Sequence, residues 1–415
     1  MEGRLELQQG IDSREAWRVT VASTIIASVA LGAPYIVIVA LKPVAADFGG
    51  YRSIPSAAAS LAMLGTGVGG LLMSWLAERL GVRSVVMFGG LMVCAGLVLS
   101  SGGSGGEVWQ LYVGHGLLVG LIGNAAIHAP LYVYVTRWFE RRRGAALALI
   151  ASGQYLAGAS WPPLFERAIA AYGWRQTMLG FGVLVATLVV LLAMVFLRPA
   201  PEARTTQTKT PLGGEGGRVL GLQPNVAFAL LAGAAFLCCV PMAMPSSHLI
   251  ALCGDVGLAP AKGATMLSVL LTCAFVSRQI WGWISDRIGG LTTVLVGSLA
   301  QATAITGFIA TQDEMGLLAV AAAFGLGFSG LIPAYILTSR QLFPAHEASW
   351  RIPTLILTGM SGMAAGSWLA GVLYDYFGFY APAFAAGFIF NLANLAIVAS
   401  LLLLWRQSQT RLALR

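Results

Sequence analysis

Residues 262–289 read KGATMLSVLLTCAFVSRQIWGWISDRIG, an apolar run that ends in a short polar turn. Such a run is long enough for one α-helix to cross a hydrocarbon core roughly 30 Å thick. Similar runs recur along the whole chain, which is 57% hydrophobic and only 10% charged. Soluble globular proteins carry about 25% charged residues. The sequence therefore predicts an all-α integral membrane protein.

The apolar runs predict twelve transmembrane helices in two sets of six. Their expected bounds are 18–42, 55–77, 83–101, 108–136, 143–165, 174–197, 225–252, 262–284, 291–311, 315–340, 351–374 and 379–405. The one long polar stretch lies between the sixth and seventh helices. We therefore expect an N-terminal six-helix half at residues 1–197, a linker at 198–223 and a C-terminal six-helix half at 224–415.

The two halves repeat the same polar signals after corresponding helices. Asp286-Arg287-Ile288-Gly289 follows the eighth apolar run, and Glu78-Arg79-Leu80-Gly81 follows the second. Arg137 and Arg340 follow the fourth and tenth runs in the same way. Matching signals after matching helices indicate two pseudo-symmetric halves, an organisation that many secondary transporters share.

The distribution of Lys and Arg predicts the orientation in the membrane. Segments on the side of the two termini hold about four times as many of these residues as the opposite side, which makes that side cytoplasmic by the positive-inside rule. We expect a multi-pass protein of the cell inner membrane with both termini in the cytoplasm. The net charge of +8 then reflects topology and contact with the lipid bilayer, and no nucleic-acid partner is expected.

Two further patterns have simple structural explanations. Gly65-Thr66-Gly67-Val68-Gly69-Gly70 matches the dinucleotide motif G-x-G-x-x-G, but it lies inside an apolar run with no strand before it. It therefore indicates close helix packing through small residues. The five cysteines lack the spacing of a disulfide framework or a metal site, so we expect them to be packing residues.

Taken together, these motifs resemble the major facilitator superfamily over nearly the whole chain. Gly282 to Gly289 fits the superfamily's loop signature G-x-x-x-D-R-x-G, and the first-half copy has Ser74 and Glu78 in place of the Gly and the Asp. Within the superfamily the chain is most similar to the monocarboxylate porter branch, which includes bacterial lactate and oxalate/formate carriers. Three stretches carry this similarity: 78–83, 137–146 and 248–286. The resemblance implies an alternating-access carrier that acts as a monomer without a cofactor.

The same resemblance suggests which residues close the cytoplasmic side. In the family, acids at the ends of helices 2 and 8 pair with nearby arginines and helix ends, and these pairs form in one state and break in the other. The corresponding residues here are Glu78, Arg137, Asp286 and Arg340. The alternative is that these charges only determine topology.

Arg278 is the one Lys or Arg that falls deep inside a predicted span, and all seventeen acids fall at helix ends, in loops or in tails. Its position eight residues before Asp286 puts it roughly 12 Å from the cytoplasmic end at 1.5 Å per residue. A charge at this depth is costly and points to a functional site. Because a guanidinium binds a carboxylate through two parallel hydrogen bonds, we expect an organic monoanion as substrate. The alternative is an arginine that packs on carbonyls or extends to the surface.

Other polar residues are candidates for the same substrate site. Asn124 and His128 are spaced i, i+4 and so share one face of helix 4. Tyr35 on helix 1 has a hydroxyl that could donate to a carboxylate. Gln154 on helix 5 and Tyr335 on helix 10 are weaker candidates. The alternative for the helix-4 pair is hydrogen bonding between packed helices.

The proton pathway of the family's animal members is altered in this chain. Those members place an aspartate four positions before the helix-8 arginine, where this chain has Ala274. His128 and His248 remain as proton-coupling candidates, because histidine titrates near neutral pH. Pro241 and Pro245 are expected to break helix 7 just before His248.

The sequence thus predicts a secondary active or facilitative transporter of small organic monocarboxylates, with the proton as a candidate coupling ion. A drug or metabolite efflux carrier of the same fold is the first alternative, and a sensor that does not transport is the second. The chain lacks the H-E-x-x-H motif of metalloproteases and has no paired carboxylates deep inside a predicted span, so we expect neither an enzyme nor a metal site.

Overall fold

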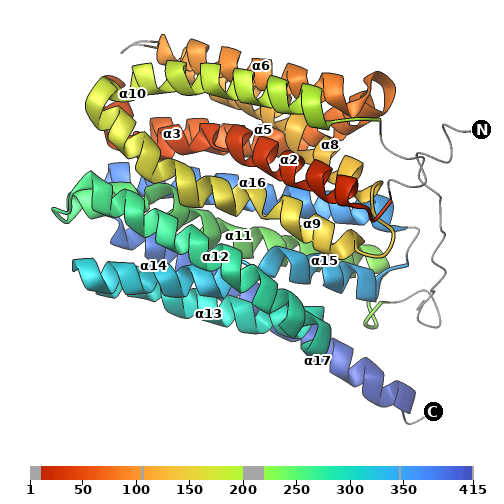
Figure 1. Ribbon diagram of the computed structural model, residues 1–415. Helices are drawn as coiled ribbons and strands as arrows, with labels where there is room; N and C mark the ends of the chain where they lie inside the picture. Colours follow the sequence, from red (N-terminus) through yellow and green to blue (C-terminus); the bar gives the residue numbers. More distant parts are fainter. Residues whose placement is uncertain (1–10, 104–106, 200–218, 345–346, 414–415) are drawn as a thin grey trace, which may run out of the picture. The chain divides into compact units, whose positions relative to one another are not determined.

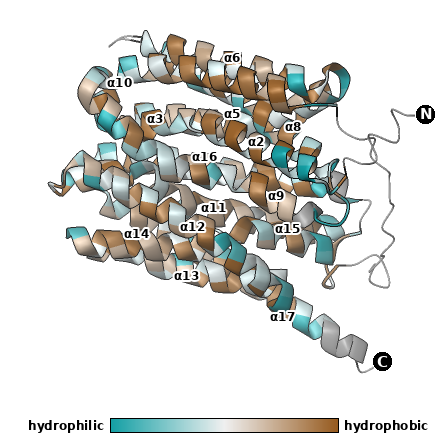
Figure 2. Cartoon of the chain, in the orientation of Figure 1, coloured by the Kyte–Doolittle hydropathy of each residue, from teal (hydrophilic) through white to brown (hydrophobic). Residues whose placement is uncertain are grey.

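The computed structural model describes residues 11–103, 107–199, 219–344 and 347–413. Regular structure in these residues is helical, and hydrophobic residues dominate along the helices (Figure 2). The chain divides into two compact units, residues 1–206 and residues 207–415. The predicted linker at 198–223 lies mostly outside the described residues. The expectation of an all-α membrane protein is confirmed.

The N-terminal unit consists of helices that follow the first six predicted spans. They are α2 (Arg14–Ala30), α3 (Ala33–Val39), α4 (Leu41–Asp47), α5 (Ser53–Leu80), α6 (Val82–Ser101), α7 (Val108–Tyr112), the π-helix η1 (Val113–Asn124), α8 (Ala125–Thr136), α9 (Arg143–Ala151) and α10 (Gly153–Phe196). Several spans are therefore built from two or three shorter helices. The first combines α2 and α3, and the fourth combines α7, η1 and α8.

The C-terminal unit follows the last six predicted spans. Its helices are α11 (Pro224–Asp255), α12 (Pro260–Ile288), α13 (Gly290–Ala310), α14 (Glu314–Phe328), α15 (Leu331–Leu342), α16 (Ala348–Phe377) and α17 (Ala381–Ala413). Helices α12, α13 and α14 run side by side (Figure 1), and α11 packs against α12, α16 and α17.

In the described residues, eleven helical segments are long and apolar enough to cross a membrane. One of them, Ala145–Phe196, covers two of the twelve predicted spans. Gly173 lies between these two spans, and its backbone is not helical, with φ 80° and ψ 164°. A positive φ is readily adopted by glycine, which has no Cβ. The chain therefore turns at Gly173 between the fifth and sixth spans.

The glycines of the G-x-G-x-x-G motif pack α5 against η1, as the sequence predicts. A Cβ added at Gly69 would lie 2.0 Å from the carbonyl oxygen of Leu121, and one at Gly65 would lie 2.6 Å from that of Gly116. Both distances are far below van der Waals contact, so only glycine allows the two backbones to approach this closely.

Helix α11 differs from its sequence-based prediction. The helix runs without interruption from Pro224 to Asp255, with Pro241 and Pro245 inside it. The prediction that these prolines break the helix is wrong. Nearly every residue from 238 to 253 is buried, and packing against neighbouring helices keeps a span helical where proline removes a hydrogen bond.

Candidate substrate and gating sites

Arg278 lies on α12, ten residues before the helix ends at Ile288. This spacing corresponds to roughly 15 Å from the helix end at 1.5 Å per residue. Its side chain is half-buried and interacts with another group of the protein. Asp286 on the same helix is exposed near the helix end. Arg278 therefore lies well inside the helical span, and the role of its guanidinium stays a prediction.

Asn124 occupies the last position of η1 and is 1% exposed. Within the described chain, neither its amide oxygen nor its amide nitrogen has a hydrogen-bond partner. A buried amide without partners is costly, so such a group calls for an explanation such as a bound polar molecule. The π-helix that ends at Asn124 is itself a rare geometry that often marks functional sites.

Three other predicted residues of the N-terminal unit are half-buried. His128 lies on α8 one turn after Asn124, with its ring 4.8 Å from that of Tyr132. Tyr35 lies on α3, just after the chain leaves α2, and Gln154 lies at the start of α10. The predicted substrate-binding residues of this unit thus come from helices 1, 4 and 5, and their role stays a prediction.

Tyr335 belongs to a polar network inside the C-terminal unit. Its side chain is 1% exposed, and its hydroxyl donates to the Oδ1 atom of Asn394 at 2.6 Å. The amide of Asn394 donates in turn to Ser298 Oγ at 2.8 Å and to Asn391 Oδ1 at 3.2 Å. A substrate could reach the hydroxyl of Tyr335 only after this network opened.

The network joins four helices of the C-terminal unit. Asn391 donates to the carbonyl oxygen of Ser298 at 3.1 Å and to Gln301 Oε1 at 3.3 Å, and the thiol of Cys238 lies 3.6 Å from the same Gln301 oxygen. Its residues belong to α11, α13, α15 and α17, and they are 0–1% exposed. We define these six residues as the asparagine network: Cys238, Ser298, Gln301, Tyr335, Asn391 and Asn394.

His248 is also fully buried, and both of its ring nitrogens are engaged. Its Nε2 atom lies 2.8 Å from the carbonyl oxygen of Ser367, and its Nδ1 atom lies 2.9 Å from the hydroxyl of Tyr380. Because a carbonyl oxygen only accepts, Nε2 carries the hydrogen of this bond. The contacts fix the ring between α11, α16 and Tyr380, which directly precedes α17. His128 is the more exposed of the two proton-coupling candidates.

The predicted gating residues differ between the two units. Arg137 Nη2 donates to Glu78 Oε1 at 3.3 Å, where the Glu78 side chain is exposed and the Arg137 side chain is half-buried. Asp286 and Arg340 are exposed, and neither has an ion pair within the described chain. The structure thus brings together the pair of the N-terminal unit but not the pair of the C-terminal unit.

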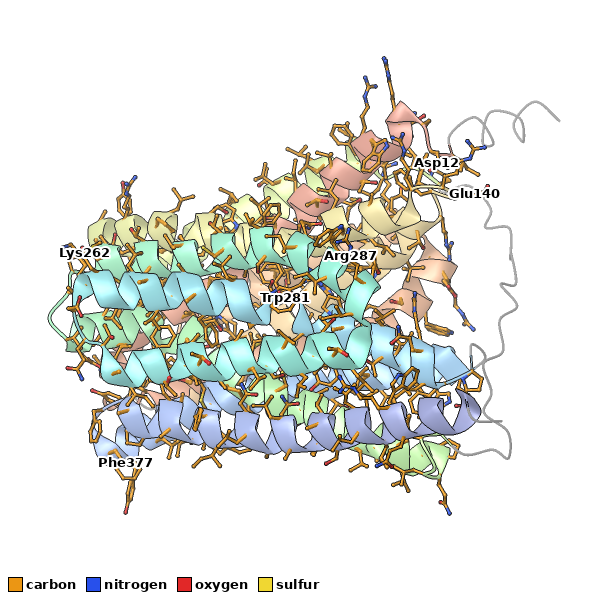
Figure 3. All side chains as sticks on the ribbon, turned by 90° about the horizontal axis from the view of Figure 1, so that it is seen from below. Asp12, Glu140, Lys262, Trp281, Arg287 and Phe377 are labelled. Carbon is orange, nitrogen blue, oxygen red and sulfur yellow. The ribbon has the colours of Figure 1, made fainter. Side chains whose placement is uncertain are left out.

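A polar clip near the start of the chain was not predicted from the sequence. The carboxylate of Asp12 accepts backbone N–H bonds from Glu140 at 3.3 Å, Arg141 at 3.0 Å and Arg142 at 3.3 Å. The backbone N–H of Asp12 donates to the carbonyl oxygen of Trp138 at 3.0 Å. Figure 3 shows Asp12 beside Glu140. We call these contacts between Asp12 and residues 138–142 the Asp12 clip.

Arg351 is a second feature that the sequence left undetected, because it looked like a basic residue at the start of a span. It is 1% exposed, and its Nε atom donates to Glu347 at 2.7 Å. Its guanidinium lies 4.2 Å from the ring centre of Phe343, 4.3 Å from that of Trp350 and 4.8 Å from that of Phe228. Aromatic faces attract a cation, so they stabilise this buried charge.

The comparison with a family model agrees with the sequence motifs. Residues 22–349 match the model described as Major Facilitator Superfamily. Monocarboxylate transporter 13 of Bos taurus is 28% identical over 79% of this chain and 75% of its own length. Monocarboxylate transporter 3 of Rattus norvegicus is 30% identical over 78% of this chain and 66% of its own length.

Solved structures show the same fold. A peptide transporter variant in complex with sulfate has a TM-score of 0.73 and 15% identity, with 97% of this chain and 99% of that chain covered. A bacterial homologue of the human lysosomal transporter Spinster, in an inward-facing and occupied conformation, has a TM-score of 0.64 and 15% identity, covering 95% of this chain and 96% of that chain. The family model, the relatives and the motifs repeated in the two halves of the chain show that this protein belongs to the Major Facilitator Superfamily. This is a family of membrane transporters and not of enzymes.

Proposed function

We propose that this transporter carries small organic monocarboxylates across the inner membrane by alternating access. The observation that carries the proposal is the position of Arg278 inside the span formed by α12. A guanidinium has five N–H donors in a fixed fork, so a carboxylate could share it with the contact that Arg278 already makes within the chain. The relatives that are named monocarboxylate transporters support the same substrate class.

The N-terminal unit has polar groups of its own that we propose for substrate binding. The buried amide of Asn124 supplies a donor and an acceptor that lack partners in the described chain. His128, Tyr35 and Gln154 are half-buried and add further polar groups. Arg278 is the one Lys or Arg deep inside a predicted span. One such cation fits a substrate with one negative charge, because a second carboxylate would remain uncompensated at membrane depth. Tyr335 acts indirectly in this proposal, through the asparagine network.

Uptake into proteoliposomes tests the proposal directly. We expect labelled lactate-like acids to enter vesicles that contain the wild-type protein. Arg278→Gln should reduce uptake by roughly a hundredfold, and Arg278→Lys by less, because lysine keeps the charge but loses the two-point geometry. Lys262→Gln is the matched control on α12, since Lys262 forms an exposed ion pair with Glu314 at the opposite end of the helix.

The same assay separates the rival functions. Inhibition of uptake by amines or bulky apolar compounds, with no effect of small acids, would favour an efflux carrier. Full activity of both Arg278 variants would refute the role of this residue. Specific binding of acids without any flux would favour a sensor.

A further inference from the structure

A pocket of about 340 Å³ lies within the N-terminal unit, at the end that the sequence predicts to be cytoplasmic. Its walls come from the end of α5, the start of α6, the end of α8 and the residues just after α10. These segments are the ends of four membrane-spanning candidates. The pocket therefore lies at the level of the lipid headgroups, where the hydrocarbon core gives way to the polar interface.

Three of the residues that line the pocket are arginines, and one is an acid. Arg137 pairs with Glu78 at 3.3 Å, and Arg198 pairs at 2.9 Å with Glu15, which lies outside the pocket lining. Arg83 is exposed at the start of α6 and has no hydrogen bond or ion pair within the described chain. The lining thus has more positive than negative groups, and within the described residues the guanidinium of Arg83 keeps all of its donors available.

The position of Arg198 is fixed by a buried residue of α8. Tyr134 is 4% exposed, and its hydroxyl donates to the carbonyl oxygen of Arg198 at 2.8 Å. This bond holds the chain just beyond α10 against α8. The backbone of Arg198 is therefore held at the pocket, while its side chain lies near the surface.

The remaining walls of the pocket are mostly apolar. Leu80, Val133 and Leu197 line it together with Val82 and Pro130. An occupant that fits both kinds of wall has an anionic head for the guanidinium groups and an apolar body for these side chains. Phospholipids have this combination, and the pocket lies at the depth where their headgroups lie.

We propose that this pocket, which we call the arginine pocket, binds the phosphate of an anionic phospholipid headgroup. Arg83 and Arg198 hold the phosphate through charge-assisted hydrogen bonds, because a guanidinium matches the geometry of phosphate oxygens. The glycerol and the first acyl carbons lie against Leu80, Val133 and Leu197. Free phosphate shares the head chemistry but leaves the apolar walls uncovered, so the lipid is the occupant that the lining favours.

A bound headgroup would also affect the gating pair of this unit. The phosphate competes with Glu78 for Arg137, because both are anions beside the same guanidinium. Lipid composition would thereby change the strength of the ion pair between Glu78 and Arg137. This lipid site is separate from substrate binding at Arg278, so either proposal can fail without the other.

Native mass spectrometry of the detergent-solubilised protein tests the lipid site. The protein is titrated with phosphatidylglycerol or with phosphatidylcholine of the same acyl chains. We expect the wild type to bind phosphatidylglycerol more tightly, and Arg83→Gln to weaken this binding roughly tenfold, since a charge-assisted contact is lost. Arg198→Gln should act in the same direction. Arg83→Lys should retain part of the preference because it keeps the charge.

Arg79→Gln is the matched control. Arg79 lies in the last turn of α5, its guanidinium stacks 4.0 Å from the ring centre of Trp75, and it does not line the pocket. This change should leave lipid binding within about twofold of the wild type, as expected for a charge outside the site. A gel-filtration profile and a thermal unfolding midpoint like those of the wild type show that each variant is folded.

Three results would overturn the proposal. Equal loss of binding in Arg79→Gln and Arg83→Gln would show unspecific attraction to basic residues. Equal affinity of the wild type for the two lipids would remove the headgroup preference. Full displacement of phosphatidylglycerol by millimolar inorganic phosphate, with the same sensitivity to Arg83→Gln, would identify a small-anion site instead.

Discussion

Asp12 shows how a single carboxylate can order a loop that the sequence leaves undefined. The residue has φ 54°, a left-handed conformation that aspartate tolerates better than most residues. Its carboxylate then accepts three consecutive backbone N–H groups just before α9, where the helix dipole also favours a negative charge. The clip ties the residue before α2 to the connection between α8 and α9.

The clip should make the stability of the N-terminal unit depend on pH. Burial raises the pKa of Asp12, but the three backbone N–H donors and the charge of Arg141 outweigh it, so that the pKa lies below its ordinary value of 3.8. A lowered pKa in the folded state stabilises the protein above the unfolded pKa, and this contribution is lost as pH falls through the folded pKa. The wild type should therefore exceed Asp12→Asn in thermal stability at pH 7, and the difference should shrink below pH of about 3.8.

Thermal unfolding of the purified protein between pH 3 and pH 7 measures this difference. Glu140→Gln is the control, because Glu140 is exposed and takes part in the clip only through its backbone N–H. A constant difference between the wild type and Asp12→Asn over the whole range would contradict the assignment.

At the scale of helices, the asparagine network contributes to the packing of the C-terminal unit. Hydrophobic association does not hold helices together inside a bilayer, so close packing and interhelical hydrogen bonds do. The network supplies such bonds between α11, α13, α15 and α17. Every one of its side chains is buried, so each lost partner leaves another polar group unsatisfied.

Asn394→Ala should therefore destabilise the C-terminal unit. Loss of the amide leaves the hydroxyls of Tyr335 and Ser298 without these partners, at a cost of about 1–3 kcal/mol for each unsatisfied group. We expect the thermal unfolding midpoint to fall by roughly 3–10 °C. Ser400→Ala is the control on α17, because the exposed Ser400 hydroxyl bonds only to its own helix at Ala396. Equal midpoints for the two variants would argue against the network.

For the whole molecule, the excess of Lys and Arg on one side predicts the orientation in the membrane. Tyr172 lies 74% exposed beside the turn at Gly173, on the side expected to face outward, and Arg141 is exposed on the opposite side. In a background without the native cysteines, Tyr172→Cys in intact cells should react with a maleimide that does not cross membranes. Arg141→Cys should react only after permeabilisation, and the reverse pattern would invert the predicted topology.

Much of the fold could be predicted from the sequence because membrane spans depend on local composition. The twelve predicted spans follow from the lengths of the apolar runs. The packing role of the glycines in α5 could be predicted because their motif lies in an apolar run with no strand before it. The continuity of α11 through Pro241 and Pro245 could not be predicted, since neighbouring helices determine whether a proline interrupts a span.

The candidate site was less accessible to sequence reasoning. The depth of Arg278 follows from counting residues along one helix. The hydrogen-bond partners of Tyr335 and His248 could not be predicted in this way, because they come from helices far away in the sequence. A signal for the asparagine network was nevertheless present: Asn391 and Asn394 are spaced i, i+3 in an apolar helix, and so share one face.

The aromatic cage around Arg351 has a mechanical consequence for the C-terminal unit. A motion that pulled α11 away from α16 at this end would separate the buried guanidinium from the ring faces that stabilise it. This loss costs free energy while the cation stays buried. We therefore expect the three rings to move together with Arg351 as one rigid group: Phe228 of α11, Phe343 just after α15 and Trp350 of α16. Any bending of this unit is then expected elsewhere along its helices.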